Sequence, residues 1–476
     1  MIWRTDFSES NSTFSMTRRE NGATLHVSQS RATDPQRILL MDQSRRGTEM
    51  IGRRDRVEHV EASQDRPGNQ PKPRRTLRDL GASAIVGLAY YVLTSVVVAL
   101  GVALGVGYIP ESFNNAHKFG ESSGAYANWD GQWYKNIAAD GYFLLNNEPS
   151  SLAFFPAFPL AGRTVAWALR IPADLALVIV ANVLLAATFI TFAIYLRERN
   201  PQAPQEFHGY ALVALGLLPT TFFFRMAYSE STFLACQVLT LYAMSRRWPL
   251  IAIAALIGLG TATRPVGVAL LPAFLLQIRD RSATRLAFAT RTATLIPLAC
   301  WGLLAYMLYQ GVAFGDPIAF ARTQSNWADR HAPSFGAKLI ALVTLEPFRS
   351  IYNPADLGYW RRYSGSLDFP FSLHAADPCI FMGAVILMML GTAKQWLTRD
   401  EAITGACLLF IPYWTHAFEQ HMTSMGRLTS AVIPVYLVLG QLAVRLPAPL
   451  VALIASLSGF FLGAEAALFS RWYRII

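Results

Sequence analysis

Charged residues are scarce in this chain of 476 residues. Asp, Glu, Lys and Arg make up only 15% of it, whereas hydrophobic residues make up 53%. A soluble domain usually carries about 25% charged residues. Because the first 76 residues are strongly polar, the apolar excess lies in the rest of the chain. This composition disfavours one large soluble core and predicts an all-α polytopic membrane protein with many spanning helices.

Cysteine is also rare, with four residues in the whole chain. Cys236, Cys300, Cys379 and Cys407 lie far apart, in or at the edge of apolar segments, and none belongs to a CxxC pair. This spacing argues against a disulfide framework and a zinc site and predicts buried free thiols. No other cluster has the spacing of metal ligands, so we expect neither a metal nor a cofactor.

The net charge of +10 does not indicate nucleic-acid binding, because Lys and Arg collect in the cytoplasmic loops and tails of membrane proteins. Residues 1–76 hold fourteen Lys and Arg against ten Asp and Glu and show no helical apolar stripe. We expect a disordered basic cytoplasmic tail there, able to touch anionic membrane lipids, and no signal peptide. Residues 77–476 then form the transmembrane domain.

The apolar segments of that domain predict about eleven spans, at 80–108, 173–196, 208–225, 229–245, 248–263, 266–278, 288–310, 376–394, 402–417, 428–445 and 448–470. Two long loops separate them, at 110–172 and 311–374. The segment 156–170 is helical in pattern but short for a span of about 20 residues. We interpret it as a re-entrant or surface helix, with a true span as the alternative.

Basic residues favour the first of these two interpretations. If 156–170 does not span, the clusters at 197–199, 246–247 and 279–285 all fall in the cytoplasm, as the positive-inside rule requires. The N-terminus is then cytoplasmic, and both long loops lie outside the plasma (inner) membrane. In this topology the C-terminus is outside, where Arg471 and Arg474 go against the rule.

Four ionisable residues share the predicted outer face: Asp130, Glu230, Arg264 and Arg427. Ionisable side chains at membrane depth are costly and are therefore functional candidates. For Glu230 and Arg264, the alternative is an ordinary interfacial charge pair. Asp130 begins a helical segment rich in Trp and Tyr, where it serves either as a base for a bound hydroxyl or as a helix N-cap. The sequence leaves both roles open.

Several blocks of sequence resemble the GPI mannosyltransferase 2 (PIG-V-like) family of membrane-embedded GT-C glycosyltransferases. The blocks, in order, are WDGQWYKNIAADGY at 129–142, FFPAFPL at 154–160, LLPTTFFFRMAYSESTFL at 217–234 and ATRPVG at 262–267, with weaker likeness in GDPIAFARTQSNW at 315–327 and SMGRLTSAVIP at 424–434. The eukaryotic members tend to carry His-Phe where this chain has Gln132-Trp133. The Ala-, Leu- and Arg-rich composition favours a bacterial chain, for which no GPI acceptor is expected.

The resemblance implies a GT-C fold and an inverting transfer of a sugar, usually mannose. The donor is a polyprenyl-phosphate-linked sugar, and the acceptor is a hydroxyl of a glycan, lipid or protein outside the cytoplasm. Asp130 occupies the position of the family's catalytic base. The arginine forks of Arg264 and Arg427 suit the donor phosphate. The expected substrate contacts are Glu230, Tyr134, Trp133, Gln324 and Trp327.

Two other classes of protein remain in competition with a glycosyltransferase. A lipid or sugar transporter often has inverted repeats and charges at the bilayer midplane, and we find no repeat in this chain. A membrane scaffold without catalytic activity predicts that Asp130 does not converge with Glu230 and Arg264.

Overall fold

The computed structural model describes residues 19–20, 23–24, 77–112, 124–145, 148–363 and 367–474. The chain divides into two units, Met1–Lys72 and Pro73–Ile476. In the first, β1 (Arg19–Glu20) pairs antiparallel with β2 (Ala23–Thr24), with Arg19 opposite Thr24. The rest of the predicted disordered tail lies outside the described residues.

The second unit is helical, and four of its helices are long and apolar enough to cross a membrane. They are α1 (Leu77–Tyr108), α4 (Ala173–Arg199), α15 (Leu373–Ala393) and α19 (Ala448–Ser470). Such lengths and compositions are those of an all-α membrane protein. These four helices coincide, to within three residues at each end, with the segments predicted at 80–108, 173–196, 376–394 and 448–470.

Two further predicted spans are bent pairs of helices. α5 (Gln205–Leu217) meets the 3-10 helix η3 (Pro219–Arg225) at 75°, and α9 (Arg285–Ala299) meets α10 (Trp301–Phe314) at 57°. Proline stands at the first bend as Pro219 and just before the second as Pro297, and proline breaks a helix because it lacks the N–H group. If each bent pair is one span, six segments of the described residues are long and apolar enough to cross a membrane, and the count of eleven stays a prediction.

The remaining predicted spans are shorter or interrupted helices. They are α6 (Glu230–Ser245), α7 (Leu250–Thr263), η4 (Pro265–Leu270) with α8 (Leu271–Asp280), α16 (Arg399–Pro412) with the π-helix η6 (Tyr413–Ala417), and α17 (Met425–Ser430) with α18 (Ile433–Ala443). Their membrane placement stays a prediction.

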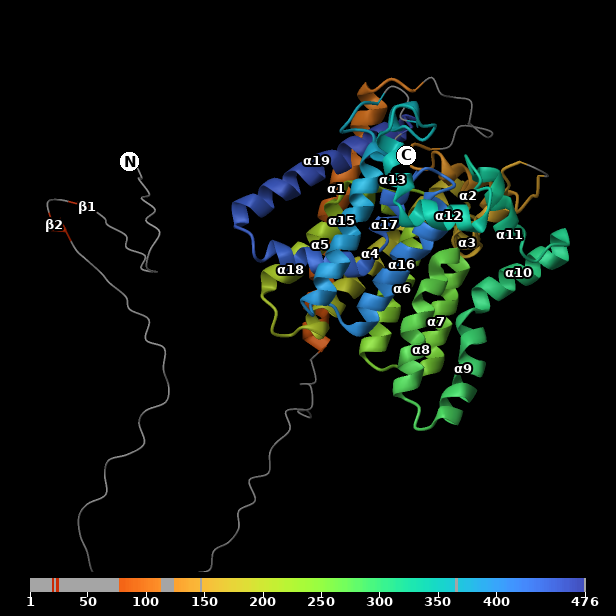
Figure 1. The fold of residues 1–476 in the computed structure, drawn as a ribbon, viewed down its shortest axis with the longest axis horizontal. Coiled ribbons are helices and arrows are strands. Elements are labelled where there is room, and N and C mark those ends of the chain that lie inside the picture. Colours follow the sequence, from red (N-terminus) through yellow and green to blue (C-terminus); the bar gives the residue numbers. More distant parts are fainter. Residues whose placement is uncertain are drawn as a thin grey trace, which may run out of the picture. The chain divides into compact units, whose positions relative to one another are not determined.

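The two long loops carry small helices of their own. The first holds α2 (Asp130–Ala139), η2 (Ser151–Ala153) and α3 (Ala157–Leu169), and the second holds α11 (Ala319–Arg322), η5 (Thr323–Trp327), α12 (Phe335–Val343), α13 (Glu346–Tyr352) and α14 (Trp360–Tyr363). In Figure 1, α2, α3, α11 and α12 lie towards the upper right of the helical unit. At 13 residues, α3 is about 20 Å long, shorter than the ~30 Å hydrocarbon core, which favours a helix that does not span.

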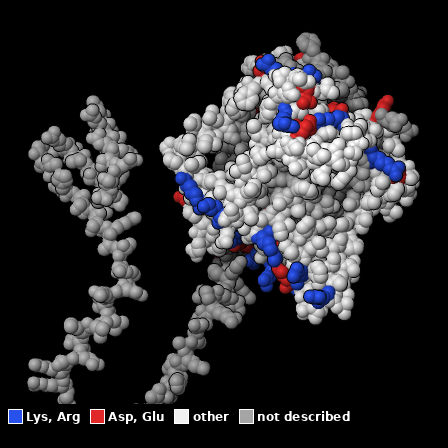
Figure 2. All heavy atoms as spheres, viewed as in Figure 1, with Lys and Arg blue, Asp and Glu red and all other residues white. Residues whose placement is uncertain are grey.

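The surface of the helical unit is apolar over a broad zone. Figure 2 shows one face, on which Lys, Arg, Asp and Glu lie mostly towards the upper and lower ends. On α1 the side chains of Ile85, Leu93 and Leu100 are 70%, 65% and 58% exposed. Large apolar side chains in such numbers are typical of a surface that faces lipid rather than water.

Candidate functional site

Asp130 is the first residue of α2, and the residue before it is conformationally unusual. Trp129 has a φ of 55°, in the left-handed region, and its side chain makes no cap hydrogen bond to the helix. Asp130 is thus inside the helix rather than at its N-cap, and its carboxylate accepts a hydrogen bond from Arg427 instead of from the helix backbone. The N-cap alternative for Asp130 is therefore wrong.

Glu230 and Arg264 also stand at helix ends. Glu230 is the first residue of α6, where the helix dipole favours a negative charge. Arg264 follows α7 in an extended conformation, with φ −154° and ψ 146°. It precedes Pro265, which disfavours helical backbone at the residue before it, so the chain leaves the helix at Arg264.

These residues and Arg427 form a chain of charges, which we call the four-charge cluster: Asp130, Arg427, Glu230 and Arg264. Arg427 Nη1 lies 2.7 Å from Asp130 Oδ2, and Arg427 Nε lies 3.4 Å from Glu230 Oε1. The same Glu230 oxygen lies 2.6 Å from Arg264 Nη1. Two acids and two arginines from separate segments therefore meet, as the sequence predicts. The pairing of Glu230 with Arg264, expected of interfacial charges, is present within this larger group.

Exposure differs sharply within the four-charge cluster. The Asp130 side chain is 27% exposed, whereas that of Glu230 is 2% exposed. Both arginine side chains are 13% exposed. Among the described residues, nothing donates a hydrogen bond to Glu230 Oε2, although that atom is buried. The cluster thus has one acid open to a substrate and one buried acid with a vacant acceptor, which is costly unless a ligand satisfies it.

Two buried tyrosines hold the cluster in place. The Tyr228 hydroxyl accepts a hydrogen bond from the Asp130 backbone N–H at 3.1 Å, and its ring centroid lies 5.4 Å from the Arg427 guanidinium carbon. The Tyr134 hydroxyl donates to Ser229 Oγ at 2.8 Å. Burial, and next the charge of Asp130, raises the pKa of Tyr228; burial, and next the charge of Glu230, raises the pKa of Tyr134. Both phenols therefore stay neutral.

The other predicted substrate contacts lie beside α2. The ring centroid of Trp133 lies 5.2 Å from that of Trp327 and 5.7 Å from that of Phe154, against which it stacks. The Tyr134 ring also packs edge-on against Phe154. Gln324, by contrast, is exposed at the wall of a cavity beside η6. The structure therefore brings Trp133, Tyr134 and Trp327 into one aromatic group, and their roles as substrate contacts stay predictions.

Asp377 is a site residue that the sequence did not indicate. It is fully buried in α15, and its Oδ1 accepts a hydrogen bond from the Gly426 backbone N–H at 2.8 Å. A Cβ at position 426 would lie 2.6 Å from that oxygen, so only glycine allows this approach. Ser424, with a φ of 62°, makes the sharp turn just before it. Asp377 thus fixes the backbone next to Arg427.

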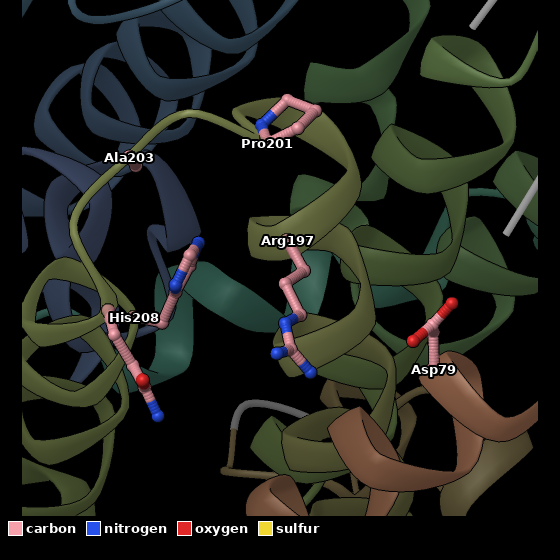
Figure 3. A pocket seen from close by; sticks show the side chains of 6 residues that line it. Asp79, Arg197, Pro201, Ala203 and His208 are labelled. Atoms are coloured by element: carbon pink, nitrogen blue, oxygen red, sulfur yellow. The ribbon is translucent and has the colours of Figure 1, made fainter. Parts of the chain in front are cut away.

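A larger cavity, of about 320 Å³, lies elsewhere and contains none of the predicted site residues. Figure 3 shows Arg197 of α4 there, between Asp79 of α1 and His208 of α5. Arg197 Nη1 donates to Ser83 Oγ at 3.2 Å. This cavity is near the Arg199 end of α4. Asp174, at the other end of α4, accepts a hydrogen bond from the Gly124 N–H, in the loop that leads to α2.

No known protein-family model matches this chain, and no curated protein matches it either. The resemblance to the PIG-V-like family therefore stays a prediction. The geometry of the four-charge cluster is the structural basis on which a function can be proposed.

Proposed function

We propose that the protein is an inverting, polyprenyl-phosphate-sugar-dependent glycosyltransferase, most simply a mannosyltransferase, with Asp130 as its catalytic base. The observation that carries this proposal is the contact between the partly exposed carboxylate of Asp130 and Arg427, which also adjoins Glu230. A base that must meet an acceptor hydroxyl has to be reachable, and cations that must meet a phosphate have to lie next to it.

The proposed reaction is a single displacement at the anomeric carbon of the donor sugar. The acceptor oxygen forms a bond to C1 while the bond from C1 to the phosphate oxygen breaks, which inverts the anomeric configuration. The acceptor proton passes to the Asp130 carboxylate, and polyprenyl phosphate leaves with the bonding electron pair. Because that leaving group is already a stable anion, positive charge at the phosphate matters more than a general acid.

Arg427 and Arg264 supply that charge. In the structure Arg427 donates to Asp130 Oδ2, and Arg264 is paired with Glu230. An incoming donor phosphate competes for the same guanidinium groups, since arginine binds phosphate oxygens with paired hydrogen bonds. In this proposal donor binding loosens Arg427 from Asp130, and the base becomes available only when the donor is present.

Purified protein reconstituted with polyprenyl-phosphate mannose and a panel of saccharide acceptors tests the proposal. We expect wild-type protein to transfer mannose with inversion, detected by NMR of the anomeric proton. Asp130→Asn should lower the rate by about 10²- to 10⁴-fold, the usual contribution of a general base. Its melting temperature should change little, because the Asp130 side chain is partly exposed.

The matched control is Asp140→Asn, which changes an exposed aspartate at the other end of the same helix. It should transfer at the wild-type rate. Transfer by Asp130→Asn at the wild-type rate would remove the base assignment. Movement of intact donor across the vesicle membrane without any sugar transfer would instead favour a transporter.

A further inference from the structure

A second, smaller cavity is lined by none of the four charged residues and has no role in the steps described so far. Its volume is about 240 Å³. One wall is η5 and the chain after it, with Gln324, Ser325 and His331; the other is the π-helix η6 and the chain after it, with Thr415, His416 and Gln420. π-Helical turns occur frequently at functional sites.

Hydrogen bonds fasten the two walls together. The backbone carbonyl of Glu419 accepts hydrogen bonds from the N–H groups of Asp329 and Arg330, at 3.0 and 3.2 Å. Arg330 Nε also donates to the Phe418 carbonyl at 2.6 Å. The two walls are therefore fixed relative to each other, because residues 329–330 on one side are bonded to residues 418–419 on the other.

The chemistry of the lining is polar but not cationic. Its described side chains include amides, hydroxyls and imidazoles, and no Arg or Lys is among them. Glu419, the one carboxylate among these described lining residues, is paired with Lys338. Phosphates and carboxylates require nearby cations, whereas amides and hydroxyls both donate and accept hydrogen bonds, as sugar hydroxyls do. The lining therefore suits a neutral, hydroxyl-rich ligand, and the volume suits a unit as small as one or two sugar rings.

Both walls lead to the four-charge cluster. On one side, Trp327 of η5 packs against Trp133, which lies on α2 one turn after Asp130. On the other side, His416 Nε2 donates to the Thr423 carbonyl at 3.0 Å, in the turn just before α17 and Arg427. These contacts therefore link the two walls of the cavity to the elements that carry the proposed base and one of the proposed phosphate-binding arginines.

We propose that this cavity is the acceptor subsite, which holds a neutral saccharide so that one of its hydroxyls reaches Asp130. The inference rests on the proposed function and adds to it the chemical class of the acceptor. The donor phosphate is held by Arg264 and Arg427, and the acceptor by Gln324, Gln420 and the hydroxyl-bearing residues between them. The two substrates thus use separate groups of side chains.

Two variants of the full-length protein test the subsite, with α-1,6-mannobiose as the probe. Ala328→Trp fills the cavity, and Gln420→Ala removes one amide from its lining. In transfer assays with polyprenyl-phosphate mannose, we expect both to raise KM for mannobiose about tenfold or more and to leave KM for the donor unchanged. Gln202→Ala, which removes an exposed amide before α5, is the matched control and should not change either KM.

Binding of mannobiose, measured by calorimetry without donor, separates the two proposals. Saturable binding by the wild type that Ala328→Trp abolishes supports the subsite. Unchanged binding and unchanged acceptor KM in both variants overturns the subsite and leaves the transferase in place. No saturable binding by the wild type, with or without donor, also overturns it. Binding that depends on the cavity but is never followed by transfer overturns the proposed function and leaves a saccharide site.

Discussion

Two buried charge clusters among the described residues differ in how completely their hydrogen bonds are made. The Arg199 cluster, formed by Tyr195, Arg199 and Glu401, lies at the last turns of α4. The four-charge cluster lies near the first turns of α4, since Tyr134 of α2 packs in one apolar group with Leu177. Roughly 30 Å of α4 separates Leu177 from the Arg199 cluster.

In the Arg199 cluster each charged group has partners. Glu401 Oε1 accepts hydrogen bonds from the Tyr195 hydroxyl and Arg199 Nε, and Oε2 accepts from Arg199 Nη2 at 2.7 Å. Oε2 also accepts from the Thr398 backbone N–H at 2.6 Å, which completes a capping box at the start of α16. The Glu401 side chain is 0% exposed. This cluster joins α4 to α16 and has no vacant group for a ligand.

The four-charge cluster, by contrast, is left incomplete. Glu230 Oε2 has no donor among the described residues, and the Asp130 side chain is partly exposed. Trp129 and Ser424, just before the segments that carry Asp130 and Arg427, both have positive φ, a conformation that costs about 1–3 kcal/mol. Charged groups whose hydrogen bonds are all made stabilise a fold. Charged groups that lack a hydrogen-bond partner, and backbone strain beside them, are typical of a binding site. The two clusters should therefore respond oppositely to mutation.

The largest expected effect on stability is that of Glu401→Ala. It leaves Arg199 buried without a counterion, and breaking a buried ion pair in this way costs about 3–5 kcal/mol. We expect a large fall in melting temperature, measured by tryptophan fluorescence in detergent, and a normal transfer rate for the protein that remains folded. Glu206→Ala, which removes an exposed acid at the start of α5, should leave both unchanged. If Glu401→Ala lost activity but kept its normal stability, the Arg199 cluster would not be purely structural.

Arg427→Lys should have the opposite effects, with a large loss of transfer activity and a small loss of stability. Lysine keeps the charge but loses the fork that reaches Asp130 and Glu230 together, so it is a poor replacement. We expect kcat to fall by about 10²- to 10³-fold, the usual loss when one transition-state donor is removed. The fall in melting temperature should be smaller than that of Glu401→Ala. The exposed Arg170, changed to Lys, is the control. Wild-type kcat in Arg427→Lys would show that the guanidinium geometry is not used.

Much of the helical framework can be predicted from the sequence alone. The segment predicted at 448–470 is α19, because the apolar run there is bounded by Pro447 and Arg471. The bend within 208–225 was not predicted. Pro219 marks its place, but its angle depends on distant contacts. Arg225, at the end of η3, donates to Thr94 Oγ1 at 2.6 Å and to Ser95 Oγ at 3.1 Å, and both acceptors belong to α1.

The candidate site, too, could be predicted only in part from the sequence. The cost of placing ionisable groups at membrane depth was enough to select Asp130, Glu230, Arg264 and Arg427. Asp377 is also an ionisable residue within a predicted span, but its role could not be predicted from the sequence, because its partner Gly426 is 49 residues away in the chain and contributes only a backbone N–H. A charge at membrane depth marks a candidate residue in the sequence, whereas a hydrogen bond to distant backbone becomes visible only in the structure.

The smallest predicted effect comes from Glu230→Gln, and it tests what the buried acid does. Glu230 lies 2.6 Å from Arg264 and 3.4 Å from Arg427, so under the proposed function it competes with the phosphate for both arginines. Removing its charge while keeping its shape should tighten binding of the product polyprenyl phosphate about tenfold, or ~1.4 kcal/mol. Product release and therefore kcat should slow by a similar factor. Binding is measured by titration of the reconstituted protein.

The equivalent change in the Arg199 cluster, Glu401→Gln, is the matched control. It also removes the negative charge beside a buried arginine, but the hydrogen bonds of the Arg199 cluster are already made within the fold, so binding of polyprenyl phosphate should not change. If Glu230→Gln leaves product affinity unchanged, or weakens it, Glu230 does not compete with the phosphate. The pair of Glu230 and Arg264 would then be structural, like that of Glu401 and Arg199, and only Asp130 and Arg427 would remain as candidates for the reaction.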